Sequence, residues 1–377
     1  MFQRLIKNDL KENKVSMLVI GLFLLLTLTL SFAATRLTVS LTSSIERFVE
    51  TAKSPHLLQM HSGSVDQERL QNFVQQHPEI ASWQLTDFVN VEGSAIRINE
   101  KNSLQDSSQD NGFSSQNQNF DFLLDQNNRP AQPQPGQVYI PLYYYNSGKI
   151  KIGDQIRVGK LQLTVQGFIR DAQMNASLVS SKRFLISQTD LQILKTEAFA
   201  SNENLIAFRV HKLSQISTIE QAYKNAELES NGPPMITYPT IKMINGFNDA
   251  LVILVMGLLV MAIIGMTFLC MRFALLTKIQ EDLQQIAVMK VMGLPQSFIS
   301  RVYLTKYYFC LALATIAGWG LSFLLSSPFK KQMALSMGQS PTPFYSYLLE
   351  MLVALLLCLL VFWLTARPLS SFKKMTP

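Results

Sequence analysis

The chain has 377 residues, 48% of them hydrophobic, and a formal net charge of +7. Its three cysteines fall one in each of three apolar runs, which excludes a disulfide scaffold and provides no zinc-binding cluster. The sequence contains no G-x-x-x-x-G-K-[ST], H-E-x-x-H or G-x-S-x-G motif. We therefore expect no catalytic site, and no cofactor or metal site, on this chain.

The first residues, MFQRLIKNDLKENK, place their apolar side chains on one helical face and their basic side chains largely on the others. This pattern predicts an amphipathic helix over 1–14 that lies in the membrane interface. A plain charged flank before the first apolar run is the alternative interpretation.

Four apolar runs have the length of about 20 residues that a helix needs to cross the hydrocarbon core. They predict transmembrane helices over 15–35, 248–271, 302–326 and 346–366. The first run is longer than the apolar region of a secretory signal and has no clear cleavage site, so we interpret it as a retained span.

Basic residues are concentrated in the 1–14 segment, the 272–301 connection and the 367–377 tail. They are Arg4, Lys7, Lys11, Lys14, Arg272, Lys278, Lys290, Arg301, Arg367, Lys373 and Lys374. The 36–247 segment is nearly neutral, and nothing in it suggests a nucleic-acid-binding face. By the positive-inside rule, both termini and the 272–301 loop are cytoplasmic, whereas 36–247 and the short 327–345 loop are external.

The 36–247 segment contains runs with the 3.6-residue periodicity of helices and runs with the two-residue alternation of strands, which predicts an extracytoplasmic α+β domain. Helical patterns cover 66–77 and 214–230, and strand-like runs include 83–91, 94–98, 137–145, 155–159, 161–169 and 204–213. The intervening 99–137 stretch is rich in Asn, Gln, Ser and Asp, and we expect most of it to be a mobile loop in which 120–124 docks. We expect two lobes, with the outer lobe at about 99–195.

Isolated titratable groups offer few candidate sites. Asp249 and Glu350 stand at the expected outer ends of two spans, where lipid headgroups would solvate them. The alternative is a pairing or gating role between helices, with Lys330 or Lys331 as partners. His56 and His61 have no nearby cysteine or carboxylate in the sequence, so we expect both to be polar side chains on the surface and not metal ligands.

The 272–301 segment predicts two helices joined by a sharp elbow. Gly293 suits a left-handed residue after a helix, and Pro295 suits the start of the next helix. Around the elbow, apolar residues are more frequent than a solvated loop should expose: Ile286, Val288, Met289, Val291, Met292 and Leu294. Such a cluster indicates either contact with another protein or packing on the chain's own helices.

The stretch EDLQQIAVMKVMGLPQSFISRVYL is similar to the acidic-apolar-Lys-x-x-Gly stretch of FtsX/MacB-type permeases of ABC transporters, the type VII or mechanotransmission systems. The matching positions are Glu281, Ile286, Ala287, Val288, Lys290, Gly293, Ile299 and Arg301. The layout also resembles that family, and so does a strand segment with Gly153, Asp154 and Gly167. The resemblance implies a helical membrane protein with four transmembrane helices and a large α+β extracytoplasmic domain inserted between helices 1 and 2. The Asn- and Gln-rich 99–137 stretch has no counterpart in this resemblance.

The resemblance implies that the cytoplasmic coupling loop 272–301 docks on a separate ABC ATPase subunit, which binds ATP and Mg. The ATPase-coupling residues would be Glu281, Ile286, Val288, Met289, Lys290, Met292, Gly293, Leu294 and Pro295. It implies a second permease copy or a sister permease, an extracellular or membrane-fusion partner and a bacterial plasma-membrane location.

The function that the resemblance implies is ATP-driven movement of the extracytoplasmic domain on peptide or amphiphilic cargo, as in export or antimicrobial peptide resistance. An FtsX-like signal transducer that controls a cell-wall hydrolase is one alternative, and an ATPase-independent membrane receptor is another.

Overall fold

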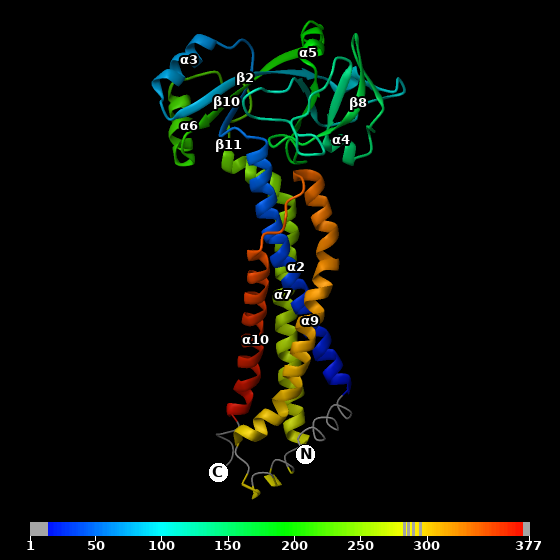
Figure 1. The fold of residues 1–377 in the computed structure, drawn as a ribbon, viewed down its shortest axis with the longest axis vertical. Coiled ribbons are helices and arrows are strands. Elements are labelled where there is room, and N and C mark those ends of the chain that lie inside the picture. The colour runs from blue at the N-terminus through cyan, green and yellow to red at the C-terminus, as the bar shows by residue number, and fades with distance from the viewer. Residues whose placement is uncertain (1–13, 282–283, 285–286, 289–290, 294–295, 372–377) are drawn as a thin grey trace. The chain divides into compact units, whose positions relative to one another are not determined.

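The computed structural model describes residues 14–281, 284, 287–288, 291–293 and 296–371. The chain divides into two compact units (Figure 1). The helical unit contains residues up to Leu41, Asn248–Gln332 and the chain from Pro341 onwards. The α+β unit contains Thr42–Phe247 together with Met333–Ser340.

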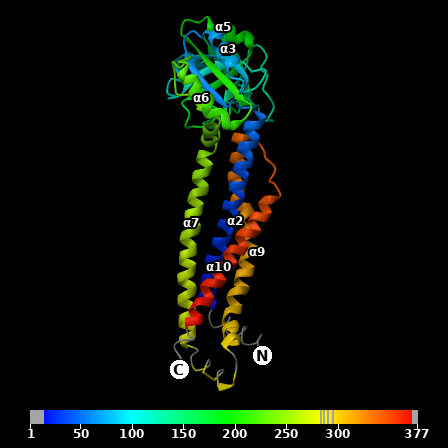
Figure 2. The same cartoon turned by 90° about the vertical axis from the view of Figure 1, so that its left-hand side faces the viewer.

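The helical unit is formed by four long helices that run alongside one another (Figure 2). They are α2 (Lys14–Thr51), α7 (Tyr238–Glu281), α9 (Gln296–Met337) and α10 (Tyr345–Ser371). All four are long and apolar enough to cross a membrane. The chain is therefore a multi-pass membrane protein, and the predicted arrangement of four apolar helices with an α+β domain between the first two is confirmed.

The core of this unit is formed by apolar side chains from all four helices. Its buried members are Met17, Ile20, Leu24, Leu28, Phe32, Met271, Tyr307, Leu311, Ala314 and Val361. Gly318 of α9 faces α2 so closely that an added Cβ would lie 3.1 Å from the Cβ of Leu28 and 3.2 Å from the Thr29 nitrogen. Small residues at such points allow membrane helices to pack without a solvent-driven hydrophobic effect.

The helices extend beyond the predicted spans. In particular, α9 was expected to end near residue 326 but continues to Met337 with Pro328 inside it. Only residues 338–344 separate α9 from α10, so the expected 327–345 loop is mostly helix. A proline costs one backbone hydrogen bond and a local clash, and packing elsewhere along a long helix offsets that cost.

The α+β unit contains one mixed sheet with the strand order β11-β1-β10-β2-β5-β9-β6-β8-β7-β3-β4. Its strands are β1 (Leu57–Ser62), β2 (Ile80–Val91), β3 (Ile96–Ile98), β4 (Asn102–Ser103), β5 (Asp110–Ser114), β6 (Gln137–Pro141), β7 (Gln155–Val158), β8 (Leu161–Ile169), β9 (Ser181–Ile186), β10 (Ala200–Val210) and β11 (Ile236–Thr237). Its helices are α3 (Gln67–Gln76), α4 (Leu142–Asn146), α5 (Gln188–Lys195) and α6 (Ile216–Asn225), with short 3₁₀ turns at Gly93–Ala95 and Leu213–Gln215.

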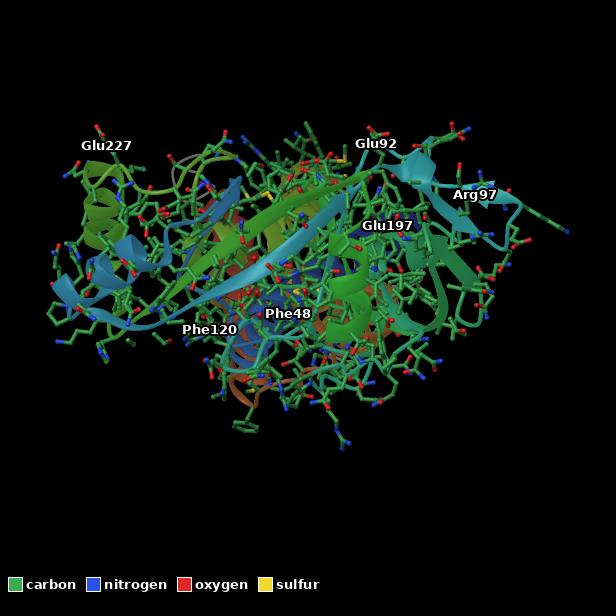
Figure 3. The ribbon with its side chains drawn as sticks, turned by 90° about the horizontal axis from the view of Figure 1, so that it is seen from above. Phe48, Glu92, Arg97, Phe120, Glu197 and Glu227 are labelled. Atoms are coloured by element: carbon green, nitrogen blue, oxygen red, sulfur yellow. The ribbon has the colours of Figure 1, made fainter. Side chains whose placement is uncertain are left out.

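The two largest hydrophobic clusters of the described α+β unit lie along this sheet. One packs α3 and α6 against strands through residues such as Leu70, Phe208 and Tyr223. The other joins strands β3 and β5–β9 to α5 and includes Phe113 and Phe184. The long strands β2 and β10 cross the domain between the end marked by Glu227 and the end marked by Arg97 (Figure 3).

Most of the 99–137 stretch lies outside helices and strands, as expected of a loop, but part of it is built into the sheet. It contributes β5, which pairs antiparallel with β2 and parallel with β9 near the middle of the sheet. Phe113 stacks on Phe184 with 4.8 Å between ring centroids. The predicted docking of 120–124 is confirmed, because Leu124 exchanges backbone hydrogen bonds with Arg170. The polar composition did not predict the ordered part of this stretch, because Asn and Gln side chains here form hydrogen bonds with backbone groups. Gln116, for example, bonds both the carbonyl and the N–H of Leu123.

Smaller differences concern the middle of the domain. The run expected as one strand over 137–145 turns at Pro141 into the short helix α4. Strand β9 and helix α5, which we did not predict, follow it in the sequence. Helix α5 starts at a capped position, where the Ser187 hydroxyl accepts a hydrogen bond from the Asp190 N–H.

Candidate functional site

The first candidate site is the segment between α7 and α9. Gly293 has a φ of +78°, the left-handed conformation that its place after a helix predicts. The Met292 N–H donates to the Val288 carbonyl at 3.0 Å, so a helical turn leads into this glycine. The side chains of Val288, Val291 and Met292 are 57%, 89% and 65% exposed.

The coupling residues proposed from the sequence are only partly described. Glu281, Val288, Met292 and Gly293 are all exposed. The described residues do not include the remaining candidates, which are Ile286, Met289, Lys290, Leu294 and Pro295. Residues 1–13 of the interfacial helix expected over 1–14 also lie outside them.

The second candidate site is a buried ion pair between helices of the membrane unit. Glu350 of α10 accepts hydrogen bonds from Arg36 of α2, from Nε to Oε1 at 2.9 Å and from Nη2 to Oε2 at 2.7 Å. The two side chains are 1% and 2% exposed. Glu350 is therefore not solvated at a helix end as we expected, and the pairing interpretation holds with a different partner.

Helix α9 completes the surroundings of this pair. The indole N–H of Trp319 donates to Oε2 of Glu350 at 2.9 Å. The guanidinium of Arg36 lies over the ring of Phe323, 3.5 Å from its centroid. Side chains from three helices thus meet at one ion pair, in which the carboxylate accepts three hydrogen bonds and the guanidinium lies on an aromatic ring.

The sequence contained a signal for this pair that we did not use. Arg36 directly follows the first predicted span and Glu350 lies near the start of the last one, and charges of opposite sign in such places often face the helix bundle and pair. Lys330, one of the partners we considered, instead donates to the Thr342 hydroxyl at 2.9 Å. Asp249 is half-buried on α7.

The α+β unit holds a further group of buried charges. Arg183 contacts Asp171 and Asp121 at 2.7 Å and 3.0 Å, with no more than 5% of any of these side chains exposed. Although burial opposes its charge, the two carboxylates raise the pKa of Arg183 above its usual value. The fully buried Lys182 donates to the backbone carbonyls of residues 174, 176 and 179, and burial lowers its pKa to about 8. These contacts hold the 171–180 turn against the sheet.

The two histidines singled out above act as hydrogen-bond acceptors. His56 is buried, not a surface residue as expected, and its Nδ1 accepts from the Val210 N–H at 3.0 Å. His61 Nδ1 accepts from the Asn231 N–H at 3.1 Å. Within the described part of the chain, no group of three or more His, Cys, Asp or Glu side chains is placed to hold a metal ion.

Comparisons with known proteins find a family match within the helical unit. The family described as FtsX-like permease C-terminal matches residues 250–373. No curated protein matches the chain. Among solved structures, the periplasmic region of MacB from Actinobacillus actinomycetemcomitans is similar, with 10% identity, a TM-score of 0.29, and coverage of 53% of this chain and 96% of that one.

The match at 250–373 spans most of α7, all of α9 and α10, and the segment with the left-handed Gly293. The elbow, helix α9 after it and the buried Glu350 therefore lie inside the matched region. Residues 250–373 thus match the FtsX-like permease family, in agreement with the resemblance noted from the sequence.

Proposed function

We propose that the chain is the membrane subunit of a bacterial ABC transporter and that a separate ATPase drives it through the 272–301 segment. The observation that carries this proposal is the FtsX-like match over 250–373, within which the elbow exposes Val288, Val291 and Met292. Exposed apolar side chains on a helical turn suit a groove on a partner protein. ATP and Mg would be bound by that partner.

The topology follows from charge. The elbow segment, the N-terminal segment and the tail carry the excess of basic residues, so we place them in the cytoplasm and the α+β domain outside. ATP hydrolysis would then act on one side of the membrane and the α+β domain on the other, with α2 and α7 as continuous helices between the two.

Peptide or amphiphilic cargo handled outside the membrane fits the interior of the helical unit. Among its described residues, the buried charged side chains are Arg36 and Glu350, and these neutralise each other. Such an interior offers no charged path for a hydrophilic solute. We therefore propose that movement of the α+β domain, and not passage through the four-helix unit, performs the work.

A second permease copy or a sister permease fits the exposed surface of α7. In the most apolar window of α7 only 11% of residues are buried within the chain, against 50% for α2. Leu254, Leu258 and Met261 are among its exposed side chains. Lipid and a second permease would share this surface.

The test is co-purification of the detergent-solubilised chain with its ATPase, with and without Met292→Asp. We expect the intact chain to retain an ATPase and the variant to lose it, because a carboxylate would be buried in the docking groove. Leu213→Asp, at a position that is 52% exposed in the α+β domain, is the matched control.

Recovery of the ATPase with the control but not with Met292→Asp supports docking at the elbow. Recovery of no ATPase with the intact chain, or equal recovery with both variants, would overturn the proposal.

A further inference from the structure

The C-terminal end of α9 belongs to the α+β unit, although most of that helix belongs to the helical unit. The compact unit that contains 42–247 also contains Met333–Ser340. Met333 and Met337 are each 3% exposed, and Leu335 packs against the hydrophobic cluster of β3 and β5–β9. The helix end is therefore anchored by apolar contacts as well as by the polar contacts below.

Arg170, which follows β8, binds the carbonyl groups at this helix end. Its Nε donates to the Leu335 carbonyl at 2.8 Å, and Nη2 lies 3.4 Å from the Ala334 carbonyl. Its Nη1 donates to the Asp125 carbonyl at 2.9 Å and to Oδ1 of Asn128 at 2.8 Å, which fixes the guanidinium in place. Arg170 itself is 4% exposed.

Two further contacts complete the end of the helix. The Asn175 side-chain amide donates to the Ser336 carbonyl at 2.9 Å. Gly338 has a φ of +87°, and its N–H donates to the Ala334 carbonyl at 2.9 Å. The last carbonyls of a helix have no partners within it and carry partial negative charge, so a guanidinium is a strong ligand for them.

We propose that Arg170 and Asn175 are positioning residues that clamp α9 to the α+β domain, so that three membrane helices, α2, α7 and α9, are joined to this domain. Helix α9 begins at Gln296, directly after the elbow, and ends in the clamp. Its 42 residues correspond to about 63 Å of helix. It therefore provides a connection from the coupling segment to the domain that is independent of α2 and α7. Only this transmission role rests on the proposed function; the clamp itself does not.

The test uses a chain in which Cys270, Cys310 and Cys358 are replaced by serine and Asn175 and Ser336 by cysteine. In native membranes, a short bifunctional thiol reagent should join the two positions, and mass spectrometry of digested peptides measures the yield. The pair Leu213→Cys with Ser336→Cys is the matched control, since Leu213 lies beside α6, a helix of the other hydrophobic cluster. A yield no higher than that of the control pair would overturn the clamp.

Arg170→Gln in the same background tests the guanidinium. We expect at least about a fivefold drop in cross-linking, with Arg170→Lys intermediate because an ammonium lacks the planar fork of donors. Arg129→Gln, at an exposed position nearby, should leave the yield unchanged. An unchanged yield with Arg170→Gln would show that Arg170 does not hold the helix.

The transmission role is tested with ATP and vanadate in membranes that contain the partner ATPase. We expect the Asn175–Ser336 pair to cross-link equally with and without nucleotide, because a connection that transmits motion must persist through the cycle. Loss of the cross-link on nucleotide binding would overturn this role. Failure to find an ATPase would overturn the proposed function alone, since cross-linking without nucleotide still decides the clamp.

Discussion

Removing either Arg36 or Glu350 should lower the free energy of unfolding of the helical unit more than most other substitutions in it. Glu350→Leu removes two charge-assisted hydrogen bonds from a guanidinium that is 1% exposed, and a third from the Trp319 indole. Breaking a buried pair by deleting one partner costs about 3–5 kcal/mol because the other charge remains without water or a counter-charge. We expect that cost for Glu350→Leu and for Arg36→Met.

The double variant should be much less damaging than either single variant. Apolar side chains of similar volume can replace a buried pair at little net cost. The expected costs give a coupling free energy of about 3 kcal/mol or more between the two positions. Trp319→Phe, which removes one hydrogen bond to the carboxylate, should cost about 1.5–3 kcal/mol.

The assay is unfolding of the purified chain in mixed micelles by increasing SDS, followed by tryptophan fluorescence. The pair Lys242–Glu46, whose side chains are 30% and 48% exposed, serves as the control, and Lys242→Gln should cost less than about 1 kcal/mol. If the single variants at Arg36 and Glu350 also cost less than about 1 kcal/mol and their effects add, then the pair is not a dry, mutually neutralised contact.

Three further outcomes are expected. Burial, with Arg209 nearby, lowers the pKa of His56 to about 4 from an ordinary 6.5. The α+β domain should therefore be most stable above pH 6.5, and its free energy of unfolding should fall by up to about 1.4 kcal/mol for each pH unit from 6.5 down to 4. Denaturation of the His56→Gln variant at a series of pH values should not show this loss. Gly318→Leu should separate α9 from α2, where an added Cβ already lies 3.1 Å from Leu28, and lower the SDS midpoint, whereas Gly320→Leu, with open space around its Cβ, should not. Gly112→Val should destabilise the α+β domain by about 1–3 kcal/mol or more, because an added Cβ would lie 1.8 Å from the Phe88 ring; a thermal melt matching that of the unchanged chain would contradict this.

The sequence contained enough information to place the membrane helices and the α+β domain. A run of about 20 apolar residues has few alternatives to a membrane helix, because its backbone must be satisfied internally in lipid. The left-handed turn at Gly293 could be predicted for a similar reason, since few other residues adopt that conformation at low cost. The helix at 66–77 followed from its spacing of Leu70 and Phe73, both buried in the structure.

Only the tertiary structure revealed the contacts between distant parts of the chain. Arg36 and Glu350 are 314 positions apart, and Arg170 and Leu335 are 165 apart. Local periodicity cannot pair such residues, because the energy that holds them arises only when the helices or strands that carry them are assembled. The same holds for β5, whose polar composition predicts a loop and whose place in the sheet depends on β2 and β9 being on either side. The sequence by itself thus determined which segments are helical and apolar. The folded chain determined which charged residues pair and which ends of the helices bind to the α+β domain.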